Sequence, residues 1–531
     1  MKKLSASSFF IVLLIITHST FSQTLKWVKQ AGSPSRANDG NATATDAVGN
    51  VYVTGRFNGT TNFGGTTLTS LGIDIFVAKY NSTGTLQWVK QAGGEGAFNY
   101  GYGIAVDGSG NVFVTGYIAA ATNFSGTTLT PVGNNDLFVA KYNSIGTFQW
   151  AIQAGASGKY CIGRGIAVDA AGNAVVTGEF QGATNFGGTT LTAIGNKDIF
   201  VASYNTAGTL LWAKQGGTSG RSNVGSGIAA DALGNIFVTG EFYGTTNLAG
   251  TNVTATGDPD MFIANFNTSG LLQWVRHAGY PSVQNNGFTT TYPVRGTAIA
   301  ADGSGNAFVT GTFIGSPDFG GMSLTQGVGR DVFTAKYNST GSLIWVKQIG
   351  MLNTNNYSYA IAADASGNCY VAGAFRNSAK FGGTTYTAIG TQDAYICKYN
   401  NIGTVEWVKQ AGSVNKFASS QGIAVNILGN VCTVGYFSGS TDFGGTILSP
   451  IGTQDVFIWV LQQATCPDAL TPTGATTSNQ KAANTVITSG INTIPNAANV
   501  TYQGGKYVML NAGFSAVSGS VFTARILGNC Q

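Results

Sequence analysis

Two glutamates occupy equivalent positions in neighbouring repeats of this sequence, and together they could serve as an acid and a base. Glu179 and Glu241 each end the string V-T-G-E. Two carboxyl groups on either side of a glycosidic bond can protonate the leaving oxygen and activate the nucleophile. Equivalent points on adjacent repeats are expected to lie about 10 Å or more apart, which exceeds the roughly 5 Å of a retaining enzyme and is marginal for an inverting one. A carbohydrate-active enzyme, a glycoside hydrolase or a lyase, is therefore kept as an alternative.

The other catalytic and metal-binding patterns are weak. His18 lies in an N-terminal segment that is expected to be removed, which leaves His277 at a position that other repeats fill with Gln. Asp107–Asn111 alternates oxygen-bearing side chains as a calcium loop does, but it lacks the glycine and the bidentate glutamate of an EF-hand. A hairpin turn capped by Asp and Asn needs the same residues. No Cys/His cluster suggests zinc. We predict no metal, no cofactor and no enzyme activity.

Seven further side chains, one from each repeat, share hydrogen-bonding chemistry. When the repeats are aligned on Ile104, the position two residues earlier carries Asn41, Tyr102, Arg164, Ser226, Thr297, Tyr359 and Gln421. If these residues surround one central opening, they form a rim that suits sugar hydroxyls, with Arg164 favouring an acidic group. Solvation of a channel entrance would need the same residues, so both interpretations stay open. These seven residues and the two glutamates are the candidate binding residues.

Tryptophans mark the repeats that must position these side chains. They are Trp27, Trp88, Trp150, Trp212, Trp274, Trp345 and Trp407, about 62 residues apart except for one longer gap. The repeat at 103–153 has four runs rich in β-branched and aromatic residues, which we name strands A (103–107), B (111–116), C (136–143) and D (148–153). Only 9% of residues are charged, as expected for sheets covered on both faces. The sequence predicts an all-β fold.

The order of the strands indicates a closed ring. Strands B, C and D each recur seven times, but the first D strand, 25–30, precedes any A strand, and the last repeat stops after its C strand near 457–462. An open solenoid has no reason to start with a last strand, whereas a ring closed by it has no free edge. We predict a seven-bladed β-propeller over 23–463, closed by the N-terminal strand. The recurring aspartate at the start of strand C is predicted to bind backbone, and the tryptophans to pack between blades.

The repeat also resembles a known family. The strings G-I-A-V-D, G-N-V-Y-V-T-G and D-x-F-V-A-K-Y-N, followed by G-x-x-x-W, are similar to the SBBP family of bacterial β-propeller repeats across residues 25–463. The last repeat departs from this pattern, with Asn426 in place of the strand A aspartate and Trp459 in place of an alanine. The resemblance implies the fold and leaves the function open, because the family is defined as a structural repeat.

The ends of the chain predict export. Residues 1–22 have the basic start and short apolar stretch of a secretory signal peptide, and no later segment reaches 18 apolar residues. We therefore expect no transmembrane segment and a secreted or cell-surface location. Residues 464–485 are predicted to be a linker and 486–531 a small β module. The strings at 500–506, 510–514 and 519–524 resemble the 3-coathanger stack module that ends many exported proteins, which implies attachment, export or packing.

The six cysteines suit an exported protein. Cys466 and Cys530 bracket the C-terminal segment and are predicted to form a disulfide, which would stabilise it by roughly 4 kcal/mol. Cys369 and Cys397 lie on neighbouring strands and could either pair or be packed thiols. No partner is evident for Cys161 or Cys432.

Charge and loop composition point to binding. The net charge is +5, and the basic residues are spread over all repeats, which argues against nucleic acid. The D–A connections are longer and more varied than the A–B and C–D turns, and varied loops on a uniform scaffold are where binding usually resides. Drift on an unconstrained surface would produce the same pattern. We predict an exported monomer whose D–A loop face binds a glycan or a surface protein. A structural component of the envelope or matrix is a further alternative.

Overall fold

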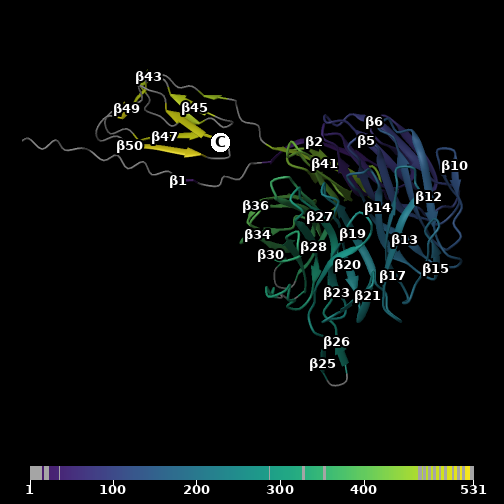
Figure 1. Ribbon diagram of the computed structural model, residues 1–531. Helices are drawn as coiled ribbons and strands as arrows, with labels where there is room; N and C mark the ends of the chain where they lie inside the picture. Colours follow the sequence, from purple (N-terminus) through teal and green to yellow (C-terminus); the bar gives the residue numbers. More distant parts are fainter. Residues whose placement is uncertain are drawn as a thin grey trace, which may run out of the picture. The chain divides into compact units, whose positions relative to one another are not determined.

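The computed structural model divides the chain into two compact units, 25–461 and 1–24 with 462–531. It describes residues 15–16, 23–34, 36–285, 288–325, 329–350 and 354–463, and beyond these only nine short strands between 469 and 526. Every regular element among the described residues is a β-strand, so the predicted all-β class is confirmed (Figure 1).

The larger unit repeats one antiparallel meander of four strands, in which each strand pairs with the next. The first four meanders are β3 (Asp39–Thr45), β4 (Val51–Asn62), β5 (Thr67–Tyr80), β6 (Leu86–Ala92); β7 (Tyr100–Val106), β8 (Val112–Ile118), β11 (Asp136–Tyr142), β12 (Phe148–Ala154); β13 (Cys161–Val168), β14 (Ala174–Phe180), β17 (Asp198–Tyr204), β18 (Leu210–Gly217); and β19 (Val224–Ala230), β20 (Ile236–Phe242), β23 (Asp260–Phe266), β24 (Leu272–Ala278).

The following meanders keep the same order of strands. They are β27 (Val294–Ala301), β28 (Ala307–Phe313), β29 (Gly329–Tyr337), β30 (Leu343–Gly350); β31 (Thr354–Ala363), β32 (Cys369–Phe375), β35 (Asp393–Tyr399), β36 (Val405–Ala411); and β37 (Ala418–Val425), β38 (Val431–Phe437), β41 (Asp455–Gln463) with β2 (Gln23–Ala31). The last sheet therefore takes its fourth strand from the N-terminal end of the repeat region, where β2 lies beside β41 (Figure 1).

Short β-hairpins extend from the connections along one edge of the meanders. In the B–C connections they are β9 (Thr122–Phe124) with β10 (Thr127–Leu129), β15 (Ala183–Asn185) with β16 (Thr190–Thr192), β21 (Thr245–Leu248) with β22 (Thr251–Thr254), β33 (Ser378–Phe381) with β34 (Thr384–Thr387), and β39 (Thr441–Asp442) with β40 (Ile447–Leu448). One D–A connection carries β25 (Val283–Asn285) and β26 (Phe288–Thr290), which project from the repeat region (Figure 1).

The hydrophobic core lies between successive sheets. Strands B and C of each meander are buried along almost their whole length, whereas strands D are only half-buried. Each apolar cluster joins two neighbouring meanders, as where Tyr52 and Ile75 pack with Ile104 and Val114. One cluster joins Val51 and Phe76 of the first meander to Val434 and Val456 of the last. The sheets thus cover one another, which is why so few positions carry charge.

The recurring aspartate of strand C binds backbone, as predicted. Asp136 accepts hydrogen bonds from the amides of Val132 and Gly133 at 2.8 and 2.9 Å. The same pair of bonds recurs at Asp198, Asp260, Asp393 and Asp455. Burial raises the pKa of Asp136, because it disfavours the charged carboxylate. The two amide hydrogen bonds offset part of this cost and stabilise the buried carboxylate at the edge of the sheet.

The tryptophans link each meander to the next, which confirms their predicted packing role. Six of the seven repeat indoles donate to a carbonyl in the following C–D turn at 2.8–3.3 Å, from Trp27 to Ser82, Trp88 to Ser144, Trp150 to Thr206, Trp212 to Thr268, Trp274 to Ser339 and Trp345 to Asn401. The Nε1 of Trp407 is buried and has no partner among the described residues. The meander that follows Trp407 has no C–D turn, because its fourth strand comes from β2.

The buried cysteines of the repeat region are free thiols, namely Cys161, Cys369, Cys397 and Cys432. Cys369 lies opposite Tyr399 and Cys397 opposite Val371, so the two sulfurs belong to diagonal rather than facing positions. Of the two alternatives for this pair, the packed thiols are therefore the observed one. Cys466 and Cys530 lie outside the described residues, and their disulfide stays a prediction.

The smaller unit contains three sheets of parallel strands. They are β42 (Ala469–Leu470), β45 (Val486–Ser489) and β48 (Tyr507–Leu510); β43 (Gly474–Ala475), β46 (Asn492–Ile494) and β49 (Ser515–Ala516); and β44 (Gln480–Lys481), β47 (Asn499–Gly504) and β50 (Val521–Ile526). β1 (Ile15–Ile16), inside the expected signal peptide, pairs with β50. Asn499 pairs with Val521 and Thr493 with Ser515, an offset of 22 residues in each case (521 − 499 and 515 − 493).

The order of these pairs means that the chain visits the three sheets in turn and then repeats. The segment 464–485, assigned to a linker by its composition, supplies β42, β43 and β44, and each of them pairs with a strand of the 486–531 segment. The first circuit of the module thus begins before residue 486.

The tryptophan contacts predict that a change to Phe destabilises the protein more at Trp345 than at Trp407. Trp345→Phe removes the bond to the Asn401 carbonyl, whereas Trp407→Phe removes an indole nitrogen that has no described partner. We expect Trp345→Phe to lower the free energy of unfolding by about 1 kcal/mol more than Trp407→Phe, the net value of one hydrogen bond. Urea denaturation of both variants measures the difference. Equal losses would contradict the assigned role of the indole bond.

Candidate functional site

A β-bulge sits near the start of strand A in every meander. In β13 the pairing steps from Gly163 directly to Gly165, so Arg164 has no partner on β14. The same step skips Asn41, Tyr102, Ser226, Thr297, Tyr359 and Gln421 in their meanders. A bulge leaves one residue unpaired and re-aims its side chain. The seven residues chosen from the repeat alignment are therefore the seven bulge residues.

The bulge is coupled to a close approach between meanders. A Cβ added to Gly163 would lie 2.2 Å from Thr115 Oγ1 of the preceding meander, and one added to Gly225 would lie 2.3 Å from Thr177 Oγ1. Because no side chain fits at these positions, the residue before the bulge must be small. The threonines are themselves held by hydrogen bonds of 2.8 Å to the Phe138 and Phe200 carbonyls.

The seven bulge residues line one cavity of about 410 Å³. Its other lining residues are Val224, Glu241, Arg295 and Gly296. Arg295 lies at the start of β27, directly after the connection that contains the β25–β26 hairpin, so the cavity opens on the face of the D–A loops. The structure thus brings the whole predicted rim together with one of the two predicted glutamates. The binding role of these residues stays a prediction.

Glu179 is held by two cations and does not line the cavity. Arg164 binds it in a bidentate manner, with Nε to Oε2 at 2.9 Å and Nη2 to Oε1 at 2.8 Å, and Lys197 Nζ lies 3.3 Å from Oε1. The carboxylate side chain is 1% exposed. Burial acts to raise the pKa of Glu179, but the hydrogen bonds and charge of Arg164, with those of Lys197, hold it below its usual value.

Glu241 occupies the equivalent position in the next meander but has a different environment. Its Oε2 lies 3.0 Å from Arg295 Nε, in an ion pair whose arginine is half-exposed. That contact lacks hydrogen-bond geometry, and the buried Oε2 accepts no hydrogen bond from a described residue. Burial raises the pKa of Glu241, and the charge of Arg295 offsets this only in part. Glu241 therefore lines the cavity with its Oε2 buried beside Arg295.

These environments do not fit the two glutamates as a catalytic pair. A general acid must be protonated before it reacts, and the contacts of Glu179 favour its charged form. Both oxygens of Glu179 are also occupied. Any acid or base chemistry in the cavity would have to use Glu241 without Glu179.

Aromatic rings form two groups at the rim. Tyr102 packs against Tyr100 and Tyr117, with ring centroids 5.6 and 5.8 Å away, and the Arg164 guanidinium lies 5.6 Å from the centre of its ring. On the other side Tyr359 stacks on Tyr357, with centroids 6.0 Å apart and planes 3° from parallel. Such supported rings present a firm face to a ligand.

Part of the hydrogen-bonding capacity of the rim is already used. Asn41 donates to the Gly101 carbonyl at 2.8 Å, Thr297 to the Thr310 carbonyl at 3.1 Å, and Gln421 to Ser419 Oγ at 2.7 Å. These bonds hold the side chains in place without using all of their hydrogen-bonding groups, since an amide group or a hydroxyl can make several hydrogen bonds. The rim is thus preorganised and still able to bind polar groups.

The other chemical candidates have structural roles. His277 Nδ1 lies 3.0 Å from Asp260 Oδ2, the contact that glutamine makes in other meanders, as from Gln91 to Asp74 at 2.7 Å. Asp107 accepts from the amides of Ser109 and Asn111, which confirms the predicted capped turn. The described residues contain no group of three or more His, Cys, Asp or Glu that could hold a metal ion, and no helix among them could span a membrane.

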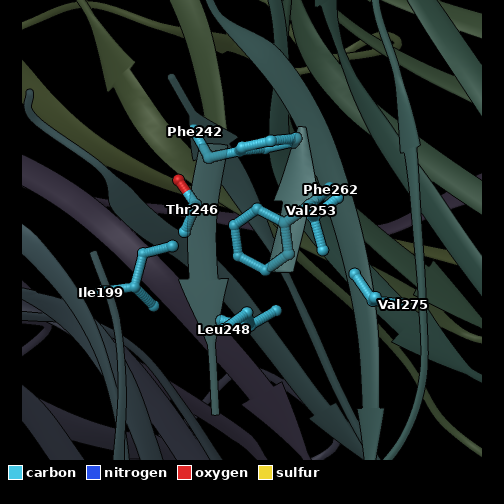
Figure 2. Close-up of a pocket in the computed structure, with 7 residues that line it drawn as sticks. All are labelled: Ile199, Phe242, Thr246, Leu248, Val253, Phe262 and Val275. Atoms are coloured by element: carbon cyan, nitrogen blue, oxygen red, sulfur yellow. The ribbon is translucent and has the colours of Figure 1, made fainter. Parts of the chain in front are cut away.

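A second, enclosed cavity carries no chemistry. It measures about 10 Å³ and is lined by Ile199, Phe242, Thr246, Leu248, Val253, Phe262 and Val275, whose side chains point toward one another beneath the β21–β22 hairpin (Figure 2). Its lining is apolar apart from one threonine, and its size is at the lower limit for a single water molecule. It is a packing gap.

Sequence reasoning missed three features of the site. Arg295 is not among the candidate residues, and neither the ion pair between Arg164 and Glu179 nor the bulges are predicted from the sequence. A signal for the ion pair was present, since Arg164 and Glu179 lie near each other across one predicted A–B hairpin. The recurring small residue before each rim position was the signal for the bulge.

Comparison with known proteins supports a β-propeller repeat protein. The sequence model of the SBBP family, described as a β-propeller repeat, matches residues 87–124 and 211–241. An uncharacterized WD repeat-containing protein of Acanthamoeba polyphaga mimivirus is 26% identical over 450 residues, which cover 70% of this chain and 32% of the viral protein. The chain thus spans about a third of the length of this relative.

Among solved structures, the chain is similar to the WD40 β-propeller domain of Doa1, with 8% identity, a TM-score of 0.41 and coverage of 83% of this chain and 97% of that domain. It is also similar to the polysaccharide lyase Uly1, with 11% identity, a TM-score of 0.40 and coverage of 80% and 90%.

The environment of Glu179 predicts a pH-dependent effect of Arg164→Met. The variant leaves a buried carboxylate with Lys197 as its remaining cation, so we expect a loss of about 2–3 kcal/mol at pH 7. The lowered pKa of Glu179 means that its contribution is present above the unfolded-state value near 4.3 and is lost as pH falls through the folded value. The difference from the unsubstituted protein should therefore shrink toward pH 4.

Denaturant unfolding at pH 7 and pH 4 measures this effect. Arg295→Met is the matched control, because it removes a half-exposed cation from the equivalent carboxylate and should cost less. A loss for Arg164→Met that is the same at both pH values would show that Glu179 is not the cause.

Proposed function

We propose that the repeat region is a seven-bladed propeller closed by its N-terminal strand. Several contacts across the junction support this. Gln30 Nε2 lies 3.0 Å from Asp455 Oδ2, the contact made by the fourth-strand glutamine within other meanders. A Cβ on Gly422 would lie 2.8 Å from the Ala42 Cα, the same approach that Gly227 makes to Ala298. Trp27 reaches the Ser82 carbonyl as the other tryptophans reach theirs.

On this scaffold, the function that the cavity supports best is binding of a glycan by the D–A loop face, without catalysis. The observation that carries this proposal is the convergence of seven bulge residues, all with hydrogen-bonding side chains, on one cavity. Sugar rings are bound by such a combination of hydrogen bonds and aromatic faces. A cavity of about 410 Å³ also suits one or two sugar units better than a folded protein.

The same proposal includes export. The features of residues 1–22 favour a secreted or cell-surface protein, and the module at the C-terminal end resembles one found in exported proteins. A glycan-binding face would then meet surface or matrix polysaccharides, in which case the protein acts in adhesion.

A carbohydrate-active enzyme is the second candidate, and one observation favours it. Glu241 lines the cavity, and burial raises its pKa. A raised pKa favours the protonated form of a carboxyl group, which a general acid requires. In this candidate Glu241 acts without Glu179, unlike the enzyme with two catalytic glutamates that the sequence suggests.

Ring closure predicts a large effect of deleting residues 23–32. Without this strand the edge of β41 is unpaired, so we expect aggregation or loss of cooperative unfolding. Thermal unfolding and size-exclusion chromatography of the shortened protein measure both. A shortened protein that stays monomeric and melts like the full chain would contradict closure by this strand.

Glycan binding predicts that the two rim tyrosines contribute to affinity. A glycan array identifies a ligand, and calorimetry then compares the full chain with a Tyr102→Ala, Tyr359→Ala double variant. We expect a loss of roughly 10- to 100-fold, because truncated aromatic contacts commonly cost more than 1 kcal/mol each. Tyr160→Ala is the matched control, since Tyr160 lies on the same face but does not line the cavity.

An unchanged affinity in the double variant would remove the cavity as the site. Incubation of the bound glycan with the protein, followed by sizing of the products, separates the two candidates. Intact glycan fits binding alone, whereas fragments that disappear with Glu241→Gln would fit the enzyme.

A further inference from the structure

Exposed aliphatic side chains recur at one position of the loop face, outside the cavity. Leu71, Val132, Ile194, Ile389 and Ile451 lie three or four residues before the strand C aspartate of their meanders, and each is 52–70% exposed. The amides of the last four donate to that aspartate, so their backbones have the same geometry. We call these five residues the collar.

A basic residue adjoins the collar in four meanders. The amide two residues after each collar residue donates to the carbonyl of a lysine or arginine in the D–A loop, from Asn134 to Lys159, Asn196 to Arg221, Thr391 to Lys416 and Thr453 to Arg36, at 2.7–3.0 Å. All four cations are exposed. Arg36, Lys159 and Lys416 form no ion pair with a described residue, while Arg221 lies 3.5 Å from Asp258. Beside Leu71 the loop carries the exposed Phe98 instead, with Glu95 near it.

The opposite face has a different charge. Its A–B turns contain Asp46, Asp107, Asp169, Asp231, Asp302 and Asp364 and no Lys or Arg, and the C–D turns carry no charged residue. Aliphatic side chains are exposed there too, including Val48, Leu233, Ile402 and Ile427. Exposed apolar groups are therefore common to both faces. Cations also reach the opposite face, where Lys336 donates to the Asn401 carbonyl and Arg276 to the Thr340 carbonyl, but six of its A–B turns carry an aspartate, whereas basic residues adjoin the collar in four meanders of the loop face.

We propose that the loop face docks on a phospholipid bilayer that carries anionic headgroups. Aliphatic side chains that enter the interface, with cations at headgroup level, are the combination that holds proteins on anionic membranes. The same pair of groups recurs around the face, which fits a laterally uniform surface. A protein partner would present one patch and would not need the repetition. This contact uses residues outside the cavity and is independent of glycan binding.

The test is co-sedimentation of the full chain with vesicles of phosphatidylcholine alone or with 30% phosphatidylglycerol. We expect binding to the anionic vesicles only, and weaker binding at high salt. An Arg36→Gln, Lys159→Gln, Lys416→Gln variant should bind roughly 100-fold more weakly, about fivefold per cation. A variant with Val132, Ile194, Ile389 and Ile451 each replaced by Ser should also lose binding.

The matched control replaces Val48, Leu233, Ile402 and Ile427 by Ser, with the same loss of apolar surface on the opposite face, and should bind like the unsubstituted chain. All these positions are exposed, so the variants should fold. Binding that survives in the collar variant, or that the control loses equally, overturns the proposal. So does binding to a soluble anionic polysaccharide with none to vesicles. The Tyr102→Ala, Tyr359→Ala variant should keep vesicle binding, which separates this result from that for the glycan.

Discussion

The closeness of the first strands of neighbouring meanders is the constraint on which the rest of the repeat region depends. A Cβ on Gly103 or Gly165 would lie only 3.1–3.3 Å from the backbone nitrogen of the next first strand. Only glycine or alanine occupies this position, with Ala42, Ala298 and Ala360 in three other meanders. Each first strand therefore has small residues on either side of its bulge residue, and the side chain of the bulge residue lines the cavity. The rim thus follows from backbone packing, and the rim residue differs in type from one meander to the next.

Contacts that join neighbouring meanders use the uniform part of the repeat. The indole of one meander binds the turn of the next, and the aspartate of each third strand binds the loop before it. Because these bonds recur with nearly the same geometry, their residues cannot vary without loss of stability. Chemical differences lie at the rim, at the ends of the second strands and in the connections on the loop face.

The strands, the capped turns and the role of the third-strand aspartates could be predicted from the sequence, because local patterns determine them. The rim residues could be chosen by alignment alone, since a repeat places equivalent positions together. The bulges could not, because they depend on the register between strands. In the smaller unit, the offset between apolar runs at 499–504 and 521–526 was visible, but parallel stacking of successive circuits requires the pairing itself. The partners of Glu179 and Glu241 depend on which side chains meet across strands and between meanders.

Those two glutamates show how one scaffold produces two chemistries. Within its own meander Glu179 meets Arg164 and Lys197, and the positions equivalent to these two cations next to Glu241 hold Ser226 and Pro259. Glu241 therefore has no cation from its own repeat and takes Arg295 from the following one, at the open edge of the cavity. These two differences between the repeats accompany the change from a carboxylate with a lowered pKa, held by two cations, to one with a raised pKa that pairs with a single arginine. Any ligand of the cavity that needs a charged or acidic partner would meet it on the side of Glu241 and Arg295.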